Sequence, residues 1–214
     1  HGHDTSLMTF KVGDELDVAL ECRSVDDLYI ITKEGRIHTI RVSALPNGRG
    51  DGLPVSSFID AEKDAFAGVF TGEDEQRVLL ATSDGMGLTC RVKDLRSYQR
   101  LGRGFFKVND GAELLAPVFF NDTYNLCASV STNGRLLVFP MEEMRELNRG
   151  GLGVVVMKLD KGESVVALTA SSQRGVVVSG IGRGGKQRDV QITKRSFEEF
   201  ASHRARKGRP IGIS

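Results

Sequence analysis

Four short loops rich in glycine and basic residues recur along the chain, and their chemistry suits the binding of phosphate groups. An arginine guanidinium is a planar donor that matches a pair of phosphate oxygens. Glycine removes the side chain that would hold a backbone amide away from an anion. The loops are Gly48-Arg49-Gly50-Asp51-Gly52, Arg100-Leu101-Gly102-Arg103-Gly104, Arg149-Gly150-Gly151-Leu152-Gly153 and Arg206-Lys207-Gly208-Arg209-Pro210. The sequence therefore predicts a surface that binds a polyanion.

Basic residues in and around these loops are the candidate phosphate contacts. In the earlier repeats they are Arg49, Arg100, Arg103, Lys107, Arg149 and Lys158. In the last repeat they are Arg183, Lys186, Arg188, Lys194, Arg195, Arg204, Arg206, Lys207 and Arg209. Any one of them could equally be a solvated surface charge, because basic side chains are mostly exposed in proteins. Contacts to about six to ten phosphates would make the logarithm of affinity fall with the logarithm of salt concentration, at a slope of about −5 to −9.

Positive charge is gathered toward one end of the chain, although the formal net charge is only +1. Residues 1–64 hold 7 Lys and Arg against 12 Asp and Glu, whereas residues 167–214 hold 10 against 3. A one-sided excess of this kind is typical of a protein that meets a polyanion.

No set of residues predicts catalysis, because no nucleophile with its base, no paired carboxylates and no metal-ligand set can be assembled. The three cysteines, Cys22, Cys90 and Cys127, lie apart in apolar segments, and we expect buried free thiols. We expect no cofactor and no metal. There is no run of 18 or more apolar residues and no secretory signal, so we also expect a cytoplasmic protein without a membrane partner.

A period of about 50 residues organises the chain. Gly35, Gly85, Gly134 and Gly184 each lie in a short polar turn, and successive ones are 50, 49 and 50 residues apart. Apolar runs flank each turn, which predicts a series of β-hairpins in which glycine supplies the positive φ of a tight turn. A further strand is predicted to open each repeat, over 16–21, 66–71, 115–120 and 165–170. An outward strand is predicted after two of the basic loops, over 104–108 and 155–159.

These units predict an all-β domain over 1–214. One small sheet cannot bury both of its faces alone, so several such units favour a propeller-like ring of four-stranded blades, a β-pinwheel. We expect about four blades plus an orphan N-terminal strand. The repeats are predicted over 16–64, 65–113, 114–163 and 164–214, with 1–15 as the end of a preceding repeat. The stretches 141–147 and 196–203 are expected to form a helical turn or two.

The pattern resembles the C-terminal β-pinwheel found in the A subunits of DNA gyrase and topoisomerase IV. The phrases that carry the resemblance are the loops above, Leu79-Leu80-Ala81-Thr82-Ser83-Asp84-Gly85, and Thr132-Asn133-Gly134-Arg135-Leu136-Leu137-Val138-Phe139-Pro140. The gyrase form carries a Gln-Arg-Arg-Gly-Gly-x-Gly box associated with tight DNA wrapping. Here Gln99-Arg100-Leu101-Gly102-Arg103-Gly104 and Arg149-Gly150-Gly151-Leu152-Gly153 match it incompletely. This departure favours the topoisomerase IV form and speaks against strong chiral wrapping.

The resemblance implies a ring whose blades exchange strands, with duplex DNA bound and bent along a basic outer rim. It implies that the domain presents DNA to an ATP-dependent type IIA topoisomerase and influences its topology preference, in decatenation and chromosome segregation. The partners would be the core of the A subunit, the ATP-hydrolysing B subunit, and a chromosome-structuring condensin at the nucleoid. The active site would lie in other domains. The alternatives are a DNA-wrapping domain of the gyrase type and a propeller-type module that binds proteins.

Overall fold

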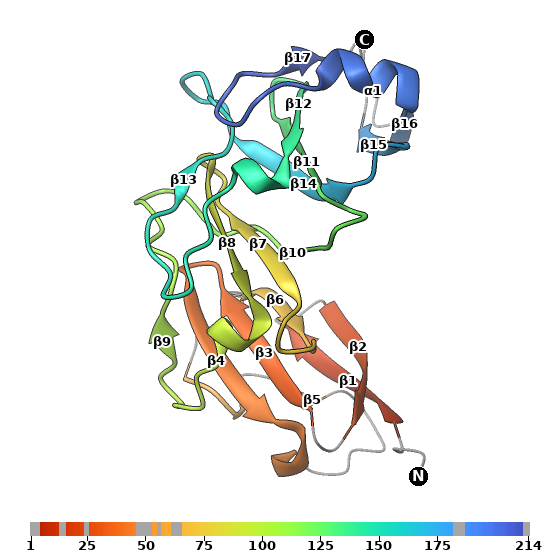
Figure 1. Ribbon diagram of the computed structural model, residues 1–214. Helices are drawn as coiled ribbons and strands as arrows, with labels where there is room; N and C mark the ends of the chain where they lie inside the picture. The colour runs from red at the N-terminus through yellow and green to blue at the C-terminus, as the bar shows by residue number, and fades with distance from the viewer. Residues whose placement is uncertain are drawn as a thin grey trace.

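The computed structural model describes residues 5–12, 16–23, 26–45, 53–54, 57–60, 66–181 and 187–211. Its sheets follow one another in a curved row, from β1 and β2 at one end to β15 and β16 at the other (Figure 1). The regular structure is almost entirely β, as the fold prediction required. None of the helices in the described part of the chain is long and apolar enough to cross a membrane.

Three four-stranded sheets repeat one plan, and all neighbouring strands in them are antiparallel. The first has the order β6 (Phe66–Phe70), β3 (Asp27–Thr32), β4 (Arg36–Arg41) and β9 (Arg103–Gly104). The second has β10 (Val118–Phe120), β7 (Arg77–Ala81), β8 (Met86–Arg91) and β13 (Val154–Val155). The third has β14 (Val165–Ser171), β11 (Leu126–Ser131), β12 (Arg135–Pro140) and β17 (Arg209–Pro210).

Each of these sheets contains strands that are far apart in the sequence. The two central strands form a local hairpin, whereas both edge strands come from later in the chain. In the first sheet Tyr29 pairs with Phe70 on one edge, and Ile37 pairs with Arg103 on the other. Each four-stranded sheet, or blade, is therefore built from one hairpin and two edge strands that come from later repeats. Adjacent blades are joined by these exchanged strands.

The remaining elements lie at the two ends of the row. β1 (Thr5–Val12) is the middle strand of a sheet with β2 (Leu16–Arg23) and β5 (Leu53–Pro54), and β5 runs parallel to it. At the other end β15 (Gly175–Ile181) and β16 (Gln187–Thr193) form a hairpin. That hairpin leads into α1, a short α-helix over Lys194–Phe200, and 3-10 turns follow three of the other hairpins, at Val42–Ala44, Val92–Leu95 and Met141–Glu143. The helical turns predicted in 141–147 and 196–203 are therefore present. The first is shorter, over Met141–Glu143, and the second begins and ends earlier, over Lys194–Phe200.

The hairpin turns have the backbone geometry that their glycines predict. Gly35, Gly85 and Gly134 have φ of 88°, 82° and 69°. In each turn the glycine amide donates a hydrogen bond of 3.0 Å to the carbonyl of the residue three positions earlier. The fourth predicted turn, at Gly184, lies outside the described residues.

The core lies between the sheets, and several hairpin strands contribute to two clusters of it. In β7, Val78 and Leu80 pack toward the first sheet, whereas Leu79 and Ala81 pack toward the third. Because successive side chains of a strand point to opposite faces, burial on both faces requires the continuous apolar runs seen in the sequence. Cys90 and Cys127 are buried free thiols, as predicted, and burial raises the pKa of Cys127 to about 12.

Candidate nucleic-acid interface

The three basic loops that the structure describes occupy equivalent places, each just before an edge strand. Gly102, Gly153 and Gly208 have φ of 68°, 79° and 77°. A methyl group at these positions would lie 2.6, 2.3 and 2.6 Å from a carbonyl oxygen of the adjacent strand, that of Ile37, Gly87 or Leu136. The glycines are thus required because a neighbouring strand approaches closely. Sequence reasoning assigned them only to the approach of a phosphate.

After each loop the chain leaves the sheet and binds the turn of the neighbouring hairpin. The amides of Phe106, Val156 and Ile211 donate to the carbonyls of the turn glycines, at 3.0, 2.7 and 2.9 Å. The predicted outward strands over 104–108 and 155–159 are therefore wrong in length. Only β9 and β13 form, each with two residues, because the amides that follow are bonded to turns instead of to a sheet.

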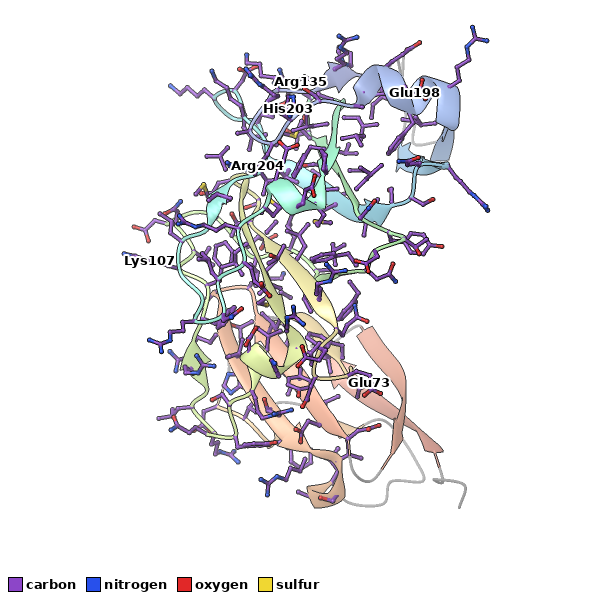
Figure 2. The ribbon with its side chains drawn as sticks, viewed as in Figure 1. Glu73, Lys107, Arg135, Glu198, His203 and Arg204 are labelled. Carbon is purple, nitrogen blue, oxygen red and sulfur yellow. The ribbon has the colours of Figure 1, made fainter. Side chains whose placement is uncertain are left out.

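Two lysines take equivalent positions in this arrangement. The amide of Lys107 donates to the carbonyl of Gly151 at 2.9 Å, and that of Lys158 donates to the carbonyl of Arg206 at 3.0 Å. Each backbone is thus tied to the next basic loop, while each side chain is exposed. Figure 2 shows Lys107 pointing away from the sheets, on the convex side of the row where β9 and β13 lie.

Six of the predicted contacts are exposed cations whose side chains have no ion-pair or hydrogen-bond partner among the described residues. Such a cation keeps all its donors for a ligand, and its charge is not neutralised by a neighbouring carboxylate. Five of them, in or next to the basic loops, are called here the free rim cations: Lys107, Arg149, Lys158, Arg206 and Arg209. The sixth, Arg195, lies on α1.

Four other predicted contacts are engaged within the protein. Arg100 forms an ion pair with Asp60 at 2.8 Å, and Lys207 forms one with Asp160 at 2.6 Å. Arg103 donates to the carbonyl of Asp94 at 3.1 Å and lies over the ring of Phe105. The half-buried Arg204 donates to the carbonyls of Glu143 at 2.9 Å and Val155 at 2.7 Å. The donors of these four side chains are therefore used, at least in part, in contacts within the protein.

Arg49, Arg183 and Lys186 lie outside the described residues, and so do the side chains of Arg188 and Lys194.

Two arginines that follow the hairpin turns position the basic loops and were missed as site residues. The guanidinium of Arg36 donates to the carbonyls of Leu101 at 2.8 Å and Gly102 at 3.1 Å. Arg135 occupies the same place two repeats later and donates to Asp160 at 2.9 Å. Asp160 also accepts a hydrogen bond from Lys207. The available signal was their shared place immediately after a turn glycine.

A buried carboxylate organises the second of these arrangements. The Glu163 side chain is fully buried, and it accepts hydrogen bonds from Ser131 Oγ at 2.6 Å and from the amide of Asp160 at 2.8 Å. Burial raises the pKa of Glu163, but these donors and the Arg135 guanidinium outweigh it, so the pKa lies below its ordinary value. The charge is therefore retained inside the fold and keeps Arg135 in place.

His38 on β4 packs under the basic loop at 100–104. Its side chain is 1% exposed, and neither ring nitrogen has a hydrogen-bond partner. Burial lowers the pKa of His38, and the nearby Arg36 lowers it further, whereas the Arg100 backbone and Asp60 raise it by less. The folded chain therefore holds a neutral imidazole beneath a candidate DNA-binding loop.

We predict that acid destabilises the chain through His38. In the unfolded chain the pKa of His38 is about 6.5, which is above its value in the folded chain. As the pH falls below about 6.5, the unfolded chain therefore binds a proton at His38 before the folded chain does. The His38 contribution to stability is thus present above that pH and lost below it. Urea unfolding midpoints at pH about 7.5 and about 5 should differ less for His38→Phe than for the parent chain. His203→Gln, at an exposed position, should keep the parent's difference. An unchanged difference in His38→Phe would contradict the assignment.

Comparison with known proteins finds one matching family model and several similar proteins. The family model described as DNA gyrase C-terminal domain, beta-propeller, matches residues 76–119 and 128–172. The A subunit of DNA topoisomerase 4 from Neisseria gonorrhoeae is 31% identical over 224 residues, which cover 100% of this chain and 28% of that protein. Its Escherichia coli counterpart is 27% identical over 152 residues, which cover 70% of this chain and 20% of that protein. The chain thus spans between a fifth and a third of the length of these relatives.

Solved structures show the same fold. The E. coli ParC C-terminal domain superimposes with a TM-score of 0.83 at 19% identity, over 97% of this chain and 93% of that one. The DNA gyrase A C-terminal domain superimposes with a TM-score of 0.66 at 18% identity, over 97% and 70%. The chain therefore has the β-pinwheel fold, and the part of it over 76–119 and 128–172 matches the model of the gyrase-type C-terminal β-propeller domains. Among the proteins that share this fold, it is similar to the C-terminal domain of the topoisomerase IV A subunit.

Proposed function

We propose that this chain binds duplex DNA along its convex rim and bends it, and so presents a DNA segment to the catalytic core of a topoisomerase IV. The observation that carries the proposal is the set of free rim cations. Lys107 and Lys158 hold equivalent positions in successive repeats, and Arg149 and Arg206 lie in the loops to which their backbones are bonded. A repeated cation on a repeated scaffold matches a ligand whose charge also repeats, such as a sugar-phosphate backbone.

The arrangement favours contacts that do not read sequence. Arg and Lys on short loops meet phosphates, and phosphate contacts fix the register of a duplex without carrying base information. The loops follow the curved row of sheets shown in Figure 1. A duplex that touches several of them in turn must bend, and the energy of those contacts offsets the cost of bending.

Other parts of the protein and other partners complete the proposed activity. The core of the A subunit would cleave DNA and the ATP-hydrolysing B subunit would drive strand passage, which together give decatenation and chromosome segregation at the nucleoid. Residues 1–64 carry more acidic than basic side chains and suit a basic protein surface better than DNA. We propose a chromosome-structuring condensin as a partner there, a contact that cross-linking of this chain to a condensin hinge would test.

Energy transfer between dyes at the two ends of a duplex tests the bending. A duplex of about 40 base pairs, well below the persistence length of about 150, is nearly straight when free. Saturation with this chain should shorten the distance between its ends and increase energy transfer. Lys107→Glu with Lys158→Glu should reduce both binding and the change in energy transfer. Saturated binding without any change in energy transfer would contradict bending while leaving binding intact.

A further inference from the structure

Two exposed leucines occupy the same place in successive basic loops. Leu101 is 66% exposed and Leu152 is 43% exposed. Each directly precedes the glycine that packs on the neighbouring strand, Gly102 or Gly153. Single exposed leucines are common on protein surfaces. Here the same exposed side chain recurs at the same position of two basic loops, which suggests that both leucines contact the same kind of ligand.

Hydrogen bonds hold the backbone of both leucine-bearing loops. Arg36 Nε and one of its terminal nitrogens donate to the Leu101 carbonyl at 3.2 and 2.8 Å. In the other loop the amide of Gly151 donates to the carbonyl of Phe105 at 2.8 Å. The glycine that follows each leucine packs closely on the neighbouring strand, where an added methyl group would lie 2.6 or 2.3 Å from a carbonyl oxygen. The two leucines are thus exposed on loops whose backbones are held in place.

Arginines lie near each leucine. Arg100 and Arg103 flank Leu101 in the chain, and their side chains are held by Asp60 and by the carbonyl of Asp94. Arg149 precedes Leu152, and Arg204 donates to the carbonyl of Val155 at 2.7 Å, in the strand β13 that directly follows the loop. An isobutyl group offers nothing to a phosphate, so its partner must present an apolar strip with anions close by on both sides.

The minor groove of duplex DNA has this combination. It is about 6 Å wide, with a phosphate row close on either side, whereas the major groove is about 12 Å wide and separates those rows. Proteins that bind the minor groove combine arginine with apolar side chains. We propose that Leu101 and Leu152 enter the minor groove and supply a part of the affinity that does not depend on salt. This inference rests on the proposed function.

Salt titrations of affinity separate the leucine contacts from the phosphate contacts. Anisotropy of a labelled A·T-rich duplex would be measured from about 50 to about 200 mM salt for the parent chain and for Leu101→Ala with Leu152→Ala. The double variant should bind about tenfold more weakly at every salt concentration because it buries less apolar surface. Its slope should equal the parent's. Arg149→Ala should instead make the slope shallower by about 0.9.

A matched control and a competitor complete the test. Val166→Ala, at a 54% exposed position on β14, removes apolar surface away from the basic loops and should leave affinity unchanged. Netropsin, which fills the minor groove, should displace the parent chain. A steep parent slope with unchanged affinity in the leucine variant, or no displacement by netropsin, would overturn the groove contact alone. A parent slope shallower than about −2 would overturn the proposed function itself.

Discussion

Changing Lys107, Arg149, Lys158 and Arg206 together to glutamate should weaken binding to duplex DNA by about a thousandfold at about 0.1 M salt. Each phosphate contact changes the logarithm of affinity by about 0.9 for every tenfold change in salt, and four contacts act together. The four side chains are exposed and have no partner within the part of the chain described. Their loss should therefore leave the fold intact, which circular dichroism would verify before anisotropy measures the affinity.

A pair of variants with equal change in charge separates local contacts from net charge. Lys107→Glu with Lys158→Glu changes the rim, whereas Arg77→Glu with Lys93→Glu changes the end of the β7–β8 hairpin that is farthest from β13. Arg77 and Lys93 are already paired, with Asp122 and Glu75. The rim pair should weaken binding by about fiftyfold or more and the control pair by much less. Equal losses would mean that only overall charge matters.

Gly150→Ala should destabilise the chain by about 3 to 4 kcal/mol. Gly150 has a φ of 77°, and a methyl group there would lie 2.0 Å from the carbonyl oxygen of Phe105, a backbone atom that cannot turn aside. Strain from positive φ and steric overlap with the neighbouring repeat therefore add. Urea unfolding measured by circular dichroism gives the free energy of unfolding for the parent and the variant.

Gly111 provides the control for that substitution. Its φ of 78° is almost the same as that of Gly150, but nothing lies within 4 Å of an added methyl group. Gly111→Ala should therefore show only the backbone cost, about 1 to 2 kcal/mol. If both substitutions cost the same, close packing between the repeats contributes nothing at Gly150.

The hairpins were predictable from sequence because their signals are local. A turn glycine between apolar runs specifies its own geometry, and the positive φ at Gly35, Gly85 and Gly134 follows from it. The edge strands were harder to assign, because β9 pairs with β4 across more than sixty residues. Two-residue strands carry no periodic pattern, so their pairing depends on the packing of whole repeats.

The sequence predicts the kind of site, a set of basic loops, better than it predicts which cations in those loops are free to bind. Basic loops are visible in the sequence, but whether a cation is free depends on neighbours that only the fold brings close. Arg100 meets Asp60, which lies 40 positions earlier, whereas Lys107 meets no carboxylate among the residues described. The loop-holding arginine Arg36 was missed for the same reason, because its acceptors lie 65 and 66 positions away.

The salt dependence of DNA affinity tests most directly whether the rim binds phosphates. The dissociation constant of this chain for a duplex of random sequence would be measured at several salt concentrations. Six or more phosphate contacts predict that the logarithm of affinity falls against the logarithm of salt at a slope of about −5 to −9. A slope shallower than about −2 would contradict the account, because so few released counterions could not come from a row of rim cations.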